Sequence, residues 1–298
     1  MNLINHKMKK KITTIYGGVN SSVADFLVNR LIPGKGIISV GPIVFLDHVY
    51  PFELKDESQA IPTGEFAHPH RGIATFSYVF EGNLSHYDSR GNHGVVSAGG
   101  AQWMKAGNGI IHDEQPFATN GNNKIFHSLQ FWINLPSTVK AEPPEYMLVP
   151  SEQVPEISLP DNAGMLRLLL GELGSLKAPI KTFCKEFIYH IRLNPKAQFS
   201  LTGKQELEYG VLVPTAAVSI NGVILSGSKI AIFDTNDQEI SLENPNIVPA
   251  DVLVFGGLHY NEAIVAEGPF VMNSRAEIAA AYRDFFEKRY GEINYTKV

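Results

Sequence analysis

The strongest constraint on what this chain can form is a pair of three-residue motifs that together hold three histidines and one glutamate. The sequence reads HPH at residues 68–70 and HDE at residues 112–114. The candidate ligands within each motif are two residues apart, and on a β-strand such residues project from the same face, roughly 6.6 Å apart. Two neighbouring strands could therefore direct His68, His70, His112 and Glu114 to one point.

Three imidazoles and one carboxylate form a nitrogen and oxygen ligand set that suits Fe, Mn, Co, Ni, Cu or Zn. A helical zinc-protease site is excluded, because it needs histidines four residues apart with a glutamate between them. The flanking residues favour strands instead. Residues 75–80 are mainly β-branched or aromatic and precede a turn at 81–83, and residues 107–109 form a Gly-Asn-Gly turn signal. We expect both motifs at or near strands of one antiparallel sheet system.

The second half of the chain has the same β character without the ligands. Turn signals such as Asn221-Gly222 separate its short strand candidates, which lie at 165–170, 187–193, 207–214, 217–220, 229–233 and 252–255. Regularly spaced short strands are typical of a barrel or sandwich. The histidines of this half, His190 and His259, are isolated, so we expect a barrel without a metal site.

A proline-rich stretch between residues 136 and 155 separates the two halves. We place the domain boundary near residue 140. This predicts an N-terminal metal-binding barrel at 1–140 and a C-terminal barrel at 141–298 that ends in a helix.

The last segment has the pattern of a helix. Residues 274–277, Ser-Arg-Ala-Glu, match the capping box at a helix start. Ile278, Tyr282 and Phe285 then repeat at helical spacing, and Gly291 ends the pattern. We expect this aromatic stripe to pack against one of the barrels.

Several residues could line a pocket beside the ligands. Phe66 and Ile110 lie two residues before His68 and His112, so they share the predicted ligand face. Residues 127–134 alternate as a strand, and Phe131 is expected to extend the same wall. Asp47, with His48, could reach the pocket mouth, or Asp47 could only cap a turn, and both interpretations are open. The polar segment 51–64 is expected to be a surface loop, either a binding lid or plain surface.

Other polar residues near the motifs are expected to lie outside the site. Asp113 and Arg71 alternate away from the ligand face, and a salt bridge is the expected role of Arg71. His86 and His93 flank a turn-rich segment and are expected to be loop histidines rather than ligands.

Composition excludes several classes of function. The net charge of −5 argues against a general nucleic-acid-binding surface. The single cysteine, Cys184, rules out an intramolecular disulfide and fits a reducing compartment. No apolar run is long enough to cross a membrane as a helix, and no apolar stretch follows the lysine-rich start as a signal peptide requires. We expect a cytoplasmic protein without a membrane partner, and a monomer is compatible with the sequence.

The motifs as a set resemble those of the pirin family, whose members are two-barrel cupins. They occur in the family's order along most of the chain: HPHRG at 68–72, EG at 81–82, QWM at 102–104, AGNGIIHDE at 106–114, LQFWINLP at 129–136 and GPFVMN at 268–273. The resemblance implies an all-β fold of two cupin (jelly-roll) barrels in tandem, with a C-terminal α-helix. It also implies that His68, His70, His112 and Glu114 are the metal ligands.

Two departures from related patterns matter. General cupins place a glutamate four or five residues after the second histidine, where this chain has Ala74 and Thr75. The carboxylate must then come from Glu114, as in pirins. Pirins often have Pro-Gly-Asp-Leu before QWM, where this chain has Ala-Gly-Gly-Ala at 98–101, which removes an acid.

The resemblance leaves two functions open. Some pirins are similar to quercetin 2,3-dioxygenases, and Glu114 would then be both a ligand and the base that deprotonates a flavonol, which reacts with O₂. Other relatives are iron-dependent redox sensors that act through protein partners, either transcription factors or metabolic enzymes. Both interpretations imply one divalent transition metal, with iron first and Mn, Co, Ni, Cu or Zn also compatible.

Overall fold

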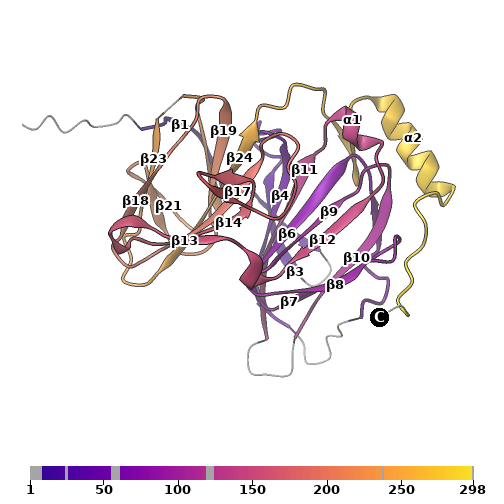
Figure 1. The fold of residues 1–298 in the computed structure, drawn as a ribbon, viewed down its shortest axis with the longest axis horizontal. Helices are drawn as coiled ribbons and strands as arrows, with labels where there is room; N and C mark the ends of the chain where they lie inside the picture. The colour runs from indigo at the N-terminus through magenta and orange to yellow at the C-terminus, as the bar shows by residue number, and fades with distance from the viewer. Residues whose placement is uncertain (1–8, 24–25, 55–60, 119–123, 237, 297–298) are drawn as a thin grey trace, which may run out of the picture. The chain divides into compact units, whose positions relative to one another are not determined.

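The computed structural model describes residues 9–23, 26–54, 61–118, 124–236 and 238–296. These residues form mainly β-strands, with one helix of several turns (Figure 1). They group into two compact units, which we call the first barrel and the second barrel. The first barrel comprises residues 20–29, 44–154 and 261–298, and the second comprises 1–19, 30–43 and 155–260. The all-β prediction is confirmed.

The first barrel is built from two main antiparallel sheets. The seven-stranded sheet has the order β12 (Glu145–Val149), β9 (Ala101–Lys105), β6 (Ile73–Glu81), β11 (Ile125–Asn134), β4 (Ile43–Glu53), β3 (Phe26–Ile32) and β2 (Val19–Val23). The four-stranded sheet has the order β5 (His68–His70), β10 (Ile110–Phe117), β7 (Asn83–Asp88) and β8 (His93–Ser97). The remaining elements are α1 (Ser137–Lys140), a 3₁₀ turn at Ser151–Gln153, β25 (Val265–Glu267), β26 (Phe270–Met272) and α2 (Arg275–Phe286).

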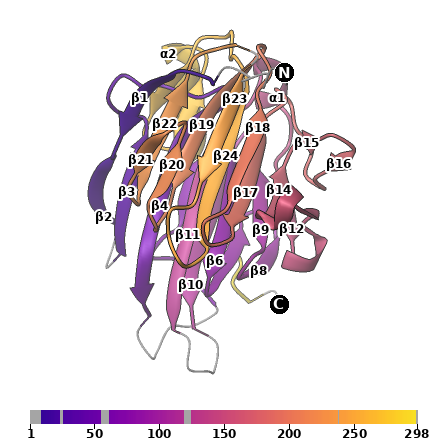
Figure 2. The same ribbon diagram turned by 90° about the vertical axis from the view of Figure 1, so that its left-hand side faces the viewer.

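The second barrel repeats this arrangement (Figure 2). Its seven-stranded sheet has the order β1 (Ile12–Tyr16), β22 (Lys229–Phe233), β19 (Leu207–Val213), β24 (Ala250–Leu258), β17 (Phe187–Leu193), β14 (Gly164–Leu170) and β13 (Glu156–Ser158). Its smaller sheets contain β18 (Gln198–Thr202), β23 (Glu239–Glu243), β20 (Val218–Ile220) and β21 (Val223–Leu225), and the pair β15 (Glu172–Leu173) and β16 (Leu176–Lys177). A 3₁₀ turn spans Pro160–Asn162.

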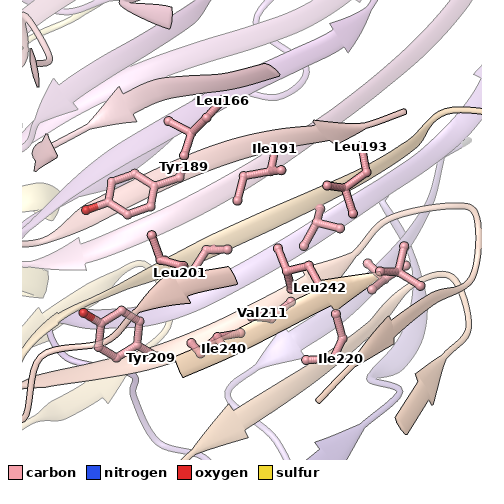
Figure 3. Close-up of a cluster of buried hydrophobic side chains, with 14 of the residues drawn as sticks. Leu166, Tyr189, Ile191, Leu193, Leu201, Tyr209, Val211, Ile220, Ile240 and Leu242 are labelled. Carbon is pink, nitrogen blue, oxygen red and sulfur yellow. The ribbon is translucent and has the colours of Figure 1, made fainter. Parts of the chain in front are cut away.

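The core of the second barrel is apolar from one sheet to the other. Alternate residues of the seven-stranded sheet, such as Ile191 and Val211, pack against Ile220 and Leu242 of the four-stranded sheet (Figure 3). All four are fully buried. Alternation sends one face of each strand inward. The sequence analysis predicted the strands that carry Ile191, Val211 and Ile220 but not β23, which carries Leu242.

The two units interleave along the chain instead of meeting at one boundary. The sequence predicted a single division near residue 140. In the structure β1, near the N-terminus, pairs with β22 of the second barrel, and residues 261–298 belong to the first barrel. Three lysines of the lysine-rich N-terminus, Lys9, Lys10 and Lys11, are described and lead directly into β1; Lys10 is buried and donates a hydrogen bond of 3.1 Å to the Asp234 carbonyl oxygen. The short run Ile12–Tyr16 of β1 is an edge strand that the prediction missed.

Helix α2 confirms the predicted capping box. The Ser274 hydroxyl accepts a hydrogen bond from the backbone N–H of Glu277, and the Glu277 carboxylate accepts one from the backbone N–H of Asn273. Ile278 and Ala281 are buried against Phe270 and its neighbours, so the helix packs on the first barrel.

No helix in the described part of the chain is long and apolar enough to cross a membrane. The cytoplasmic location stays a prediction.

The capping interaction gives a prediction about stability. Ser274→Ala should lower the free energy of unfolding by about 1 kcal/mol, because it leaves a helix N-terminal amide without its acceptor. Urea denaturation followed by circular dichroism measures the change. Ser22→Ala, on the exposed strand β2, is the control. Equal stability losses in both variants would contradict the role of the cap.

Candidate metal centre

The two histidine motifs are brought together by the pairing of β5 with β10. In this antiparallel pair His112 lies directly opposite His68, and Ile110 lies opposite His70. Gly72, just after β5, has φ +82°, and a Cβ there would lie 2.0 Å from the Val271 carbonyl oxygen. Only glycine fits this turn without displacing the backbone. The local sequence HPHRG therefore fixes both the strand and its exit.

The ring nitrogen atoms of the three histidines converge. The Nε2 atom of His68 lies 2.9 Å from that of His70 and 3.1 Å from that of His112. The Nδ1 atoms of His68 and His70 meet the carbonyl oxygens of Phe66, at 2.7 Å, and of Pro269, at 3.0 Å. A carbonyl oxygen can only accept, so each of these Nδ1 atoms carries the proton. In a neutral ring the Nε2 atom then presents its lone pair.

Burial keeps the imidazoles of His70 and His112 neutral. Burial first, and then the neighbouring histidines, hold the pKa of His70 and of His112 well below the ordinary value. Nitrogen lone pairs that face each other at such distances repel unless a cation lies between them. Neutral imidazoles with Nδ1 fixed by a second group are the usual ligands of Zn, Fe, Ni and Cu. The donor set therefore fits a divalent transition metal.

Glu114 lies beside this group rather than within it. Its Oε1 atom is 3.6 Å from Nδ1 of His112 and 3.8 Å from Nδ1 of His86, and these three residues form a second potential metal-binding group. Its two oxygens accept hydrogen bonds from the side-chain amides of Gln102, at 2.5 Å, and Gln130, at 2.8 Å. The assignment of Glu114 as a fourth ligand therefore stays a prediction.

His86 differs from the expectation that it is a loop histidine. It lies on β7 directly opposite Glu114 of β10, and it is fully buried. Its Nε2 atom is 3.3 Å from Asp88, and its ring stacks on Tyr146 at 4.3 Å. His93 likewise lies on a strand, β8, but is exposed. The strand NLSHYD is buried on both faces, so it lacks the alternation that marks a half-buried strand.

A cavity of about 200 Å³ lies against Glu114 and His68. Its lining residues include Phe66 and Asp47, for the latter of which the sequence left two interpretations open, together with Ser77 and Gln130. The remaining wall is mostly apolar. It comes from Val23, Phe26, Val28, Val49, Leu84, Pro116, Phe126 and Leu129, together with the polar Ser128. The segment 51–64, predicted to be a loop near this mouth, begins as the end of β4, and residues 55–60 lie outside the described residues.

Two predicted wall residues lie elsewhere. Ile110 is fully buried in a separate apolar cluster with Ile73 and Met104. Phe131 packs against Phe76, its partner across the sheet. The prediction assigned Phe131 to the pocket, whereas of the residues of β11 the cavity is lined by Ser128, Leu129 and Gln130.

The face of β11 that carries Gln130 also carries Trp132, whose ring lies edge-on to His70 at 4.9 Å and stacks on Phe45 at 4.0 Å. Polar or amphipathic residues thus face the ligands, and the purely apolar ones fill the core. The sequence analysis missed the contacts of Gln102, Gln130 and His86 with Glu114, because isolated polar residues carry no periodic signal.

The predictions for the two intervening residues are consistent with the structure. Arg71 points away from the ligands and forms an ion pair of 2.7 Å with Asp284 of α2. Asp113 also faces away, and its carboxylate accepts hydrogen bonds from the Gly64 amide and the Tyr295 hydroxyl. Both contacts hold neighbouring segments against the ligand strands.

Comparison with known proteins identifies this arrangement. A pirin family model matches residues 25–133, and a model of the pirin C-terminal cupin domain matches residues 188–291. The chain belongs to the pirin family. Among pirin relatives, a Pseudomonas aeruginosa protein named putative quercetin 2,3-dioxygenase is 32% identical over 287 residues, covering 94% of this chain and 98% of that protein.

Solved structures support the pirin fold. A structure from Acinetobacter baumannii, described as quercetin 2,3-dioxygenase, is 31% identical with a TM-score of 0.87, and the match covers 96% of this chain and 100% of that one. The Escherichia coli pirin YhhW, solved in complex with nickel(II), is 22% identical with a TM-score of 0.62, covering 83% of this chain and 100% of that one. The latter shows the shared fold.

The geometry predicts one metal ion per pirin chain, bound in the first barrel. His112→Ala should weaken binding of Co²⁺ or Ni²⁺ by at least about a hundredfold, because it removes one of three converging nitrogens. Equilibrium dialysis with metal analysis measures this. The exposed His93→Ala is the control, and His190→Ala tests the second barrel. Loss of metal from His190→Ala, or two tightly bound ions per chain, would contradict the prediction.

Proposed function

We propose that this pirin is a metal-dependent dioxygenase that opens the central ring of a flavonol such as quercetin. The observation that carries the proposal is the convergence of three Nε2 atoms beside a cavity that also presents the Glu114 carboxylate. The names of the Pseudomonas and Acinetobacter relatives support the same class of reaction.

The metal would be held by His68, His70 and His112, with iron as the first candidate. Nickel is also compatible with the ligands and is the ion in the E. coli relative. A divalent ion bound there would polarise a substrate hydroxyl and leave open positions for a second small molecule such as O₂. The backbone carbonyl oxygens of Phe66 and Pro269 hold the rings of His68 and His70 in place for this role.

Glu114 is the proposed base. Hydrogen bonds from the side-chain amides of Gln102 and Gln130 orient its two oxygens. The carboxylate also lines the cavity, where it can accept the proton of a flavonol hydroxyl. As the pirin resemblance implies, Glu114 would also be the fourth ligand of the metal.

The remaining wall suits an aromatic ring. The ring of Phe26 stacks on that of Phe52, with 4.8 Å between the ring centroids, and its centroid lies 5.8 Å from that of Phe66. Pockets for drug-sized ligands measure roughly 300–1,000 Å³. A cavity of about 200 Å³ therefore encloses the reacting ring of a flavonol rather than the whole molecule.

The proposed activity is tested with protein purified without added metal. Metal content is measured by mass spectrometry, and the protein is loaded separately with iron, manganese, cobalt, nickel or copper. We expect aerobic quercetin to lose its near-visible absorbance together with oxygen uptake. Absence of turnover with every metal would contradict the enzyme and favour the alternative, a metal-binding regulator that acts through a protein partner.

A substitution separates the two roles of Glu114. Metal-saturated Glu114→Gln should still bind the flavonol, but its kcat should fall by at least about a hundredfold, as expected for loss of a general base. The exposed Glu152→Gln is the control. Near-normal turnover of the metal-saturated Glu114→Gln protein would remove the base role and leave Glu114 as a ligand only.

A further inference from the structure

The two glutamines that hold Glu114 differ in how their amide groups are used. Gln102 is buried, and both ends of its amide are engaged. Its Oε1 atom accepts a hydrogen bond of 3.0 Å from the Tyr146 hydroxyl, while its Nε2 atom donates to Glu114. The carboxylate can only accept from this nitrogen, which fixes the orientation of the amide. Both the carbonyl and the amino group of Gln102 are therefore held by protein partners.

Gln130 uses only one end of its amide within the protein. Its Nε2 atom donates to Oε2 of Glu114. Among the described residues no donor meets its carbonyl oxygen. The side chain is half-buried and lines the cavity together with His68 and Ser77. A hydrogen-bond acceptor of fixed orientation is thus presented at the cavity wall, beside the proposed base.

We propose that Gln130 is a substrate-binding residue, whose carbonyl accepts a hydrogen bond from a second substrate hydroxyl, distinct from the one that Glu114 deprotonates. This inference rests on the proposed function. It specifies the substrate class further: a polyhydroxylated aromatic molecule, because an amide carbonyl can pair with a hydroxyl but not with an ether or a ketone.

The anchoring of Gln130 explains how one side chain can discriminate. Its nitrogen donates to Glu114, so a flip of the amide would break that hydrogen bond and point the carbonyl oxygen at the carboxylate. A ligand without the second hydroxyl leaves the carbonyl unpaired when it displaces water. Such an unpaired group lowers affinity more than a lost surface hydrogen bond does.

Ligand binding to the metal-loaded protein without oxygen tests the inference. The probes are quercetin and 3-hydroxyflavone, which keeps the reacting hydroxyl and lacks all the others. Gln130→Leu, and Gln130→Met as a variant closer in length, should weaken quercetin binding about tenfold more than 3-hydroxyflavone binding, because loss of the hydrogen bond to Glu114 acts on both ligands and loss of the carbonyl acts on quercetin alone. Gln102→Leu should change the binding of both molecules by the same factor, because Gln102 is a positioning residue that acts through Glu114.

The outcomes are distinct. Gln115→Leu, on the opposite face of β10 from Glu114, is the matched control and should change neither affinity. Metal content checks that each variant is folded. If the Gln130 variants weaken both ligands equally, or neither, the inference is overturned while the proposed function stands. If the wild-type protein binds no flavonol, the proposed function fails and this inference fails with it.

Discussion

The metal centre depends on the antiparallel register between β5 and β10. Because His68 and His112 are directly opposite, and His70 follows two residues later on the same face, three imidazoles share one point. Carbonyl oxygens then hold the Nδ1 protons of His68 and His70, so the facing nitrogens are acceptors. If either strand slipped by one residue, the pairing would place Pro69 opposite His112 or Ile111 opposite His68.

The C-terminal segment, residues 261–298, returns to the first barrel and supports the candidate metal centre. Pro269, which fixes His70, belongs to the C-terminal segment that packs on the first barrel. Asp284 of the same segment pairs with Arg71 between β5 and the Gly72 turn. The last part of the chain therefore completes a site whose histidines are all in the first half. A single boundary near residue 140 would separate the histidines from this support.

The all-β fold and the three histidines could be predicted because both rest on periodicity. Spacing of two residues placed the ligands on one face, and apolar alternation marked the core strands of the second barrel. The polar surroundings of Glu114 could not be predicted in the same way. Gln102 and Gln130 lie on strands of the other sheet and meet Glu114 through cross-sheet packing, whereas His86 meets it through the pairing of β7 with β10. Phe131 was assigned to the pocket because apolar character marks a core as readily as a pocket.

X-ray absorption of the nickel- or zinc-loaded protein tests the central claim most directly, because it counts imidazole ligands without requiring activity. The account predicts three imidazole rings around one ion, with nitrogen or oxygen ligands at about 2.0–2.2 Å and the outer-ring scattering of histidine. In His112→Ala the remaining signal should correspond to two rings. A spectrum of the wild-type protein with fewer than three imidazoles, or with sulfur bound to the metal, would contradict the account.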